Sequence, residues 1–118
     1  MPRAEFTQHQ GRRILRVDYS GLAPEDFVAE MKKAMRVIAA EPLGSVRLLT
    51  IPTAQLDERM ADSIRRFAPE KGKYVLAEAL VGGTAFHKLL FLSNRAKYQL
   101  VREVFDDELL AKEWLASR

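Results

Sequence analysis

Residues 24–51 read PEDFVAEMKKAMRVIAAEPLGSVRLLTI and contain a helix signal followed by a strand signal. Pro24 suits the first position of a helix, because its missing N–H has no helical partner to lose there. Glu25 and Asp26 follow in the first turn, where the helix dipole favours negative charge. Apolar residues then recur at helical spacing with charges opposite them, and these are Phe27, Met31, Ala34, Met35 and Ile38. An amphipathic helix is therefore predicted from Pro24 to just before Pro42.

Strand signals lie on both sides of this helix. Residues 46–51 are short and mostly apolar, which is typical of a strand covered on both faces, and Pro52 ends the run. Upstream, residues 5–8 and 14–19 are strand candidates, and Gly11 offers the turn that would join them in a hairpin.

Helices and strands continue to alternate toward the C-terminus. We expect a helix from about residue 58 to residue 67, capped by Asp57 and ended by Pro69. Later elements are a strand over 74–81, a helix that ends or bends near residue 94, a strand over 101–105 and a terminal helix. The predicted order is β-β-α-β-α-β-α-β-α. This order predicts an α/β fold in one domain, residues 1–118, whose single-layer, mixed and mainly parallel sheet has helical cover.

Composition narrows the function classes. The 118 residues are 47% hydrophobic and 30% charged, as in a globular protein. The net charge is +3 with both signs interspersed, so we expect no nucleic-acid partner. Cysteine is absent, which excludes disulfides and thiol catalysis. No apolar run is long enough for a signal core or a membrane span. We therefore expect a cytoplasmic protein without stable membrane insertion.

Catalytic and metal-binding patterns are missing from the sequence. His9 and His87 are the two histidines, and His87 has only Gly83 and Phe91 four residues away, so it has no local ligand pair. No Gly-x-Ser-x-Gly motif is present either. We therefore expect no enzyme, no metal and no cofactor.

Four segments together resemble a known family. They are residues 13–22 (RILRVDYSGL), 45–50 (SVRLLT), 79–84 (ALVGGT) and the tail from VFDD at 104–107 through AKEWL at 111–115. In order and spacing they resemble the STAS superfamily, in its SpoIIAA-like branch. The resemblance implies a small, often regulatory, partner-binding domain, with some relatives linked by fold to CRAL-TRIO lipid carriers.

The phosphorylation switch of the regulatory STAS members does not carry over. The resemblance implies a serine at a helix start after the central strand, in a pattern like Asp-Ser-Ser-Gly. Residues 55–60 read QLDERM here, and Ser63 lies too far into the helix to replace that serine. Glu58 would either cap this helix with Asp57 or place a permanent negative charge near its start.

The turn Gly82-Gly83-Thr84 is a candidate anion site. Backbone N–H groups at a helix start, freed by glycine from crowding, can hold a phosphate or carboxylate, and Lys88 would add a charge. The alternative is a tight strand-to-helix turn with Thr84 as the N-cap, where glycine supplies positive φ.

The segment 86–92 is apolar over more than one helical face. Phe86, Leu89 and Leu90 would fill the core, while Phe91 and Leu92 point sideways. A helix that is apolar on two sides is buried or lies against another surface. Core packing, a homodimer face and the wall of an apolar ligand pocket are the three alternatives, and Phe86, Phe91 and Leu92 are the candidate residues.

Asp18, Thr50 and Thr53 lie at or beyond the ends of two strands and would cluster if those strands are neighbours. Ligands of open α/β sheets gather at such carboxyl ends. The alternative is that Asp18 satisfies a loop amide.

Two functional hypotheses follow. The first is a non-enzymatic, STAS-like regulatory or interaction module, a homodimer that binds another protein. The alternative is a carrier or sensor for a lipid or small anion that uses residues 82–92. An empty apolar cavity would favour the carrier, and a flat exposed apolar patch would favour the interaction module.

Overall fold

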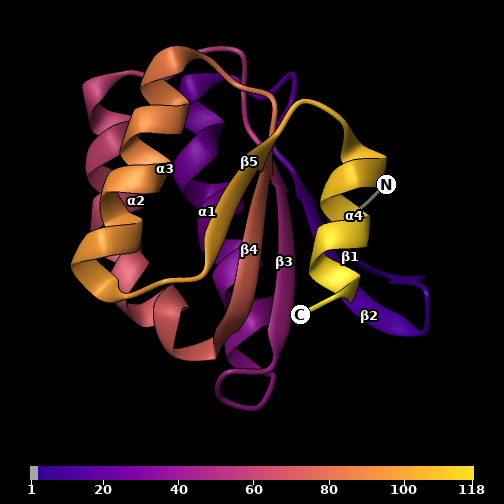
Figure 1. The fold of residues 1–118 in the computed structure, drawn as a ribbon. Coiled ribbons are helices and arrows are strands. Elements are labelled where there is room, and N and C mark those ends of the chain that lie inside the picture. Colours follow the sequence, from indigo (N-terminus) through magenta and orange to yellow (C-terminus); the bar gives the residue numbers. More distant parts are fainter. Residues whose placement is uncertain (1–2) are drawn as a thin grey trace.

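Five strands form one sheet in the order β1-β2-β3-β4-β5, with helices on both faces (Figure 1). The computed structural model describes residues 3–118, apart from the side chains of Ala96 and Tyr98. The predicted order of elements and the mixed, mainly parallel sheet are confirmed. The elements are β1 (Ala4–His9), β2 (Arg12–Asp18), α1 (Pro24–Ala39), β3 (Val46–Ile51), α2 (Glu58–Tyr74), β4 (Val75–Val81), α3 (Ala85–Tyr98), β5 (Arg102–Phe105) and α4 (Glu108–Ala116).

A hairpin opens the sheet. β1 pairs antiparallel with β2, whereas β2, β3, β4 and β5 are parallel to one another. The two turn residues Gln10 and Gly11 have φ of +51° and +77°, which is the positive-φ geometry of a tight hairpin turn. The predicted hairpin at Gly11 is therefore confirmed.

The helices divide unequally between the two faces. Figure 1 shows α1, α2 and α3 on one side of the sheet and α4 on the other. Alternation along β3 sends Leu48 into the core beneath α1 and α2, and Leu49 into the core beneath α4. Ala77 and Ala79 of β4 are fully buried against Leu115 of α4. The face beneath α4 is therefore tightly packed, and the pocket lies on the face with three helices.

Two helices are longer than expected. α2 continues to Tyr74 with Pro69 inside it, so the expected end near residue 67 is wrong. Burial of Ala68 and the contact of Lys71 with the sheet hold the last turns in place, and this packing offsets the hydrogen bond that proline lacks. α3 runs unbroken past Asn94, which is buried, and ends at Gln99 in the left-handed conformation typical of a C-cap.

None of the helices within the described part of the chain has both the length and the apolar character needed to cross a bilayer.

Candidate functional site: an apolar pocket with a buried ion cluster

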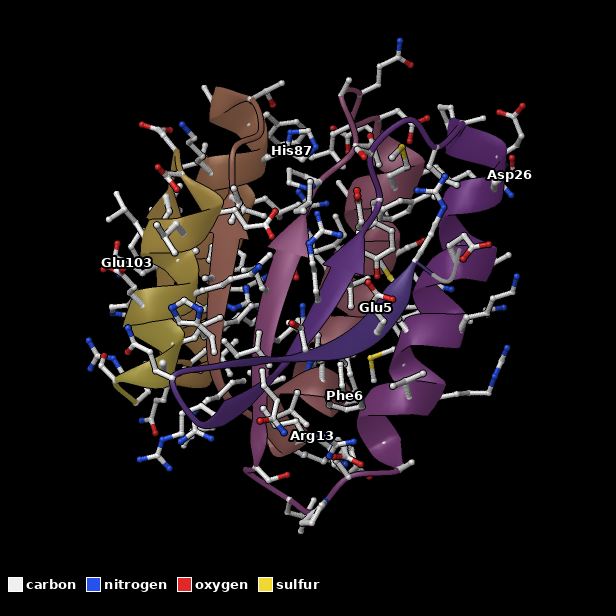
Figure 2. All side chains as sticks on the ribbon, turned by 90° about the vertical axis from the view of Figure 1, so that its right-hand side faces the viewer. Glu5, Phe6, Arg13, Asp26, His87 and Glu103 are labelled. Atoms are coloured by element: carbon white, nitrogen blue, oxygen red, sulfur yellow. The ribbon has the colours of Figure 1, made fainter. Side chains whose placement is uncertain are left out.

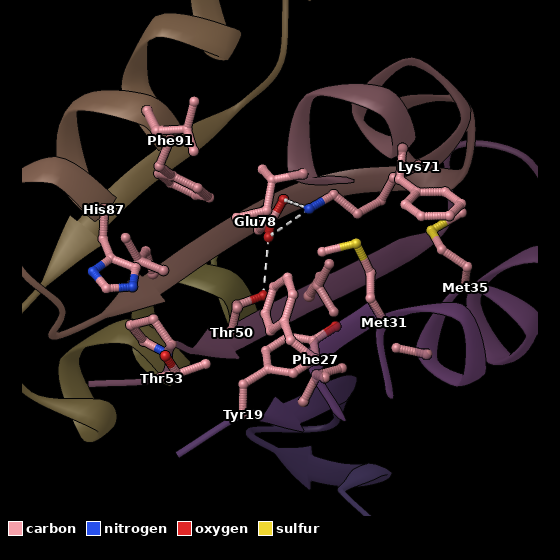
Figure 3. Close-up of a pocket in the computed structure, with 18 of the residues that line it drawn as sticks. Tyr19, Phe27, Met31, Met35, Thr50, Thr53, Lys71, Glu78, His87 and Phe91 are labelled. Atoms are coloured by element: carbon pink, nitrogen blue, oxygen red, sulfur yellow. Dashed lines mark hydrogen bonds and ion pairs between the residues drawn. The ribbon is translucent and has the colours of Figure 1, made fainter. Parts of the chain in front are cut away.

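A cavity of about 90 Å³ lies between the sheet and the three helices that share its face. Figure 3 shows its lining side chains converging from both layers. One water needs roughly 10–15 Å³, so several waters or a small ligand would fit. The apolar stripe of α1, predicted as core, forms one wall. α2 adds Ile64 and Phe67, and the loop after β3 adds Pro52 and Leu56.

The carboxylate of Glu78 reaches this pocket from the middle of β4. Its side chain faces the helices because neighbouring residues Ala77 and Ala79 face α4. Glu78 is 1% exposed. Its Oε2 accepts hydrogen bonds from Thr50 Oγ1 at 2.9 Å and from Lys71 Nζ at 3.1 Å, drawn as dashed lines in Figure 3. Its Oε1 lies 3.1 Å from Arg102 Nη2.

We call Glu78, Lys71 and Arg102 the ion cluster. Burial alone would raise the pKa of Glu78, but the charges of Lys71 and Arg102 outweigh burial and lower it. Burial lowers the pKa of Lys71, as does the charge of Arg102, and Glu78 offsets only part of this. With two cations and one anion, the cluster carries one excess positive charge.

Arg102 is held rigidly at the end of the cluster. It is 4% exposed, and its Nη1 donates to the carbonyl oxygen of Phe91 at 3.0 Å. Its guanidinium lies 4.4 Å from the centre of the Phe91 ring, a cation–π contact. Within residues 3–118, its Nε has no hydrogen-bond partner. The arginine therefore keeps an unused donor in a buried place, which is rare in native proteins.

His87 lines the same pocket from the first turn of α3. Its Nδ1 accepts from the backbone N–H of Thr84 at 3.1 Å, and its own N–H donates to Thr84 Oγ1 at 3.3 Å. This reciprocal pair is a capping box. The accepting role of Nδ1 assigns the proton of the neutral ring to Nε2. His87 is 6% exposed, and its Nε2 has no partner among the described residues.

The stability of the protein should depend on pH through His87 (Figure 2). Burial lowers the pKa of His87 in the folded protein below its unfolded value of about 6.5. The unfolded chain therefore binds the proton more readily as the pH falls below about 6.5, and stability is lost there, by at most about 1.4 kcal/mol per pH unit.

The measurement is chemical denaturation above and below pH ~6.5 on wild type and His87→Gln. Glutamine keeps a capping-box acceptor but does not titrate, and His9 is common to both proteins. Equal pH dependence in the two proteins would contradict the assigned role of His87.

The structure separates the predicted strand-end residues. Thr50 and Thr53 line the pocket, but Asp18 lies on the other face, so a three-residue cluster is wrong. The register explains the split, because Val17 is the partner of Thr50 and the next residue faces the opposite way. Asp18 Oδ1 accepts from the N–H of Ser20 at 2.8 Å, which is the alternative that the sequence left open.

The turn before α3 has the geometry of a tight turn. Gly82 and Gly83 have φ of +78° and +96°, and a Cβ on Gly83 would lie 3.0 Å from Pro52 Cγ. Thr84 uses its N–H in the capping box, and Lys88 Nζ lies 3.6 Å from Asp106 Oδ1. An anion at this turn stays an untested prediction, and the proposals below do not use it.

The buried face of α3 differs from the expected one. Phe91 is 7% exposed and lines the pocket, Leu92 is half-buried, whereas Leu89 is 68% exposed and Phe86 is also exposed. The expectation that Phe86 and Leu89 fill the core is wrong. The buried side of the helix includes the polar residues His87 and Asn94 beside Leu90 and Phe91. The most apolar side of α3 is therefore not the side that faces the core.

Sequence reasoning missed the ion cluster. Glu78 is a charged residue within the strand predicted over 74–81, and a charge there signals a buried partner. The predicted helix end at Pro69 leaves Lys71 outside that helix, and Arg102 lies within the strand predicted over 101–105. Neither position indicates a contact with Glu78 until the order of β4 and β5 is known.

Comparisons with known proteins define the fold. No protein-family model matches the sequence, and a search of the curated proteins finds no significant match. The structure is similar to that of an uncharacterised DUF3478-family protein from Shewanella loihica, described as having a SpoIIAA-like fold. The TM-score is 0.74 at 16% identity, over 95% of this chain and 91% of the other. The protein thus belongs structurally to the SpoIIAA-like α/β folds, as the sequence resemblance implied.

Ser63 lies inside α2. It is buried, and its hydroxyl donates to the carbonyl oxygen of Arg59 at 3.1 Å.

Proposed function

We propose that this protein is a non-enzymatic binding protein that holds one small, largely apolar molecule between the sheet and helices α1, α2 and α3. The observation that supports this proposal is the cavity of about 90 Å³. Small-molecule sites are usually concave and mostly apolar, with a few placed polar groups. The pocket has this composition, with the ion cluster and His87 as its polar groups.

Packing density supports the same proposal. Protein cores contain few voids larger than a water molecule. A space of about 90 Å³ lined mostly by apolar side chains departs from that rule, as ligand pockets do.

Methionine methyl groups provide the test. Met31 and Met35 line the pocket, whereas Met60 is fully buried outside its lining. We expect titration with butanol to shift the NMR signals of the Met31 and Met35 methyl groups and to leave that of Met60 unchanged. Ala34→Leu should abolish these shifts, because Ala34 lies on the pocket wall and the larger side chain takes the ligand's space.

The matched control is Ala39→Leu, an exposed position on the same helix, which should respond like wild type. Shifts of all three methyl groups in Ala34→Leu, or none in wild type, would contradict the proposal.

The interaction-module hypothesis rests on a different surface. Leu89 and Phe86 of α3 are exposed and form the apolar face that a protein partner or a second copy would cover. Partner binding, the homodimer and the cytoplasmic location stay predictions that no observation on this structure tests.

A further inference from the structure

We propose that the ligand is a monocarboxylic acid with an aliphatic body, and that Lys71 and Arg102 bind its carboxylate. This inference rests on the proposed function and names the chemical class of its ligand. It follows from three features of the pocket: its excess charge, its unpartnered donors and its shape.

The excess charge is the first feature. Glu78 neutralises only one of the two cations that face it, Lys71 and Arg102. Arg102 is nearly inaccessible, and an uncompensated cation in such surroundings is costly. A ligand with one negative charge would make the site neutral, whereas a neutral ligand would leave the excess cation unpaired.

The second feature is a pair of unused donors on pocket-lining residues. Among the described residues that line the pocket, three buried side-chain atoms have no hydrogen-bond partner, namely Arg102 Nε, His87 Nε2 and Glu78 Oε1. Glu78 Oε1 is an acceptor, but it lies 3.1 Å from both Lys71 Nζ and Arg102 Nη2, which leaves the two nitrogens as the unused groups. An arginine nitrogen can only donate, and so can the protonated nitrogen of a neutral histidine. An ionised carboxylate only accepts, and it can take several hydrogen bonds at once. It therefore complements both atoms, which an amine or a second cation would not.

Shape supplies the third feature. Figure 3 shows Glu78 and Lys71 meeting at the wall of a space that Phe27 and Met31 also border. A second hollow beside the ion cluster measures only about 10 Å³, which is room for one water at most. The apolar pocket is the larger of the two spaces beside the cations, so an acid bound there would lay its aliphatic body along the α1 wall.

The pH dependence of Lys71 fits this arrangement. Burial lowers its pKa, so the empty site can shed its excess charge by releasing a proton from the amine. A bound carboxylate would hold that proton in place. Affinity for the acid should therefore weaken as the pH rises through the lowered pKa of Lys71.

Calorimetric titration with three probes tests the inference. Butanoate carries the acid and an aliphatic body, butanol carries the body alone, and acetate carries the acid with almost no body. We expect wild type to bind butanoate at least about tenfold more tightly than butanol, because a hydrogen bond to a charged group contributes about that much. Acetate should bind at least about tenfold more weakly than butanoate, because it buries two fewer CH₂ groups.

Lys71→Met is the decisive variant. The Lys71 side chain is 21% exposed, and its loss leaves Glu78 paired with Arg102 and Thr50, so the fold should survive. We expect the variant to lose the preference for butanoate while keeping the affinity for butanol, and Lys71→Arg to restore the preference. Lys73→Met, an exposed lysine on the same turn that pairs with Glu70, is the control and should behave like wild type.

The outcomes separate the two proposals. Equal affinity of wild type for butanoate and butanol would overturn the acid-binding inference and leave the ligand-binding function standing. Binding of neither probe would overturn both. A butanoate preference that persists in Lys71→Met, with circular dichroism confirming the fold, would contradict the assignment of the carboxylate to Lys71.

Discussion

Replacing Glu78 with glutamine is expected to lower the free energy of unfolding by about 3–5 kcal/mol. The change removes the carboxylate that pairs with both Lys71 and Arg102 and leaves two cations facing each other in a buried place. Domains of this kind are stable by about 5–15 kcal/mol in total, so the variant would lose a large share of its stability. Urea denaturation monitored by circular dichroism measures the loss.

Two further variants separate charge from side-chain loss. Glu103→Gln, at an exposed position of the neighbouring strand β5, should change stability by less than about 0.5 kcal/mol. Adding Lys71→Met to Glu78→Gln should recover part of the lost stability, because one of the two unpaired cations is gone. The account of the ion cluster is wrong if Glu78→Gln is as stable as Glu103→Gln.

Phe91→Ala is expected to destabilise the protein by about 3 kcal/mol, the lower end of the range for a buried phenylalanine. Phe91 is buried and carries the guanidinium of Arg102 over its ring. One side of the ring borders the existing pocket, so the new cavity joins space that is already open, which keeps the cost from being larger. Denaturant unfolding again gives the value.

Leu89→Ala is the matched control two positions earlier on α3. Leu89 is mostly exposed, so its truncation should cost less than about 0.5 kcal/mol. The reverse ranking, with Leu89→Ala the more damaging change, would show that α3 is rotated from the orientation described above and that Phe91 is not a wall of the pocket.

The sequence predicted correctly those helices, strands and caps that depend on residues close together in the chain. The apolar stripe of α1 matches the five buried residues of that helix, and β3 has the predicted bounds. Asp57 and Thr84 cap α2 and α3 as their positions indicated, each by accepting a hydrogen bond from a backbone N–H of the first turn. Periodicity and capping depend on residues close in sequence, so one sequence suffices to find them.

The candidate site depends on contacts between distant segments, which one sequence does not reveal. Lys71, Glu78 and Arg102 come from a helix and two strands, and they meet only because β4 and β5 are neighbours. α2 continues past Pro69 because tertiary packing stabilises its last turns. The sequence pattern ends the helix at Pro69, so it does not place Lys71 on a helix that faces the sheet. On α3, the polar residues His87 and Asn94 lie inward, so hydrophobicity alone indicated the wrong face.

The fold alone names no ligand, since one fold hosts many functions. The proposal therefore rests on the pocket and its charges, and it revises the order of the two hypotheses drawn from the sequence. The ligand-binding alternative now comes first, and its site is the space between the sheet and three helices rather than the turn at Gly82.

The most direct test of a ligand in this pocket is NMR titration of wild type and Ala34→Leu with butanoate. The account predicts saturable shifts of the Met31 and Met35 methyl signals in wild type and none in Ala34→Leu, whose larger side chain occupies the pocket. Equal shifts in the two proteins would place the ligand elsewhere, and an unresponsive wild type would contradict the proposed function itself.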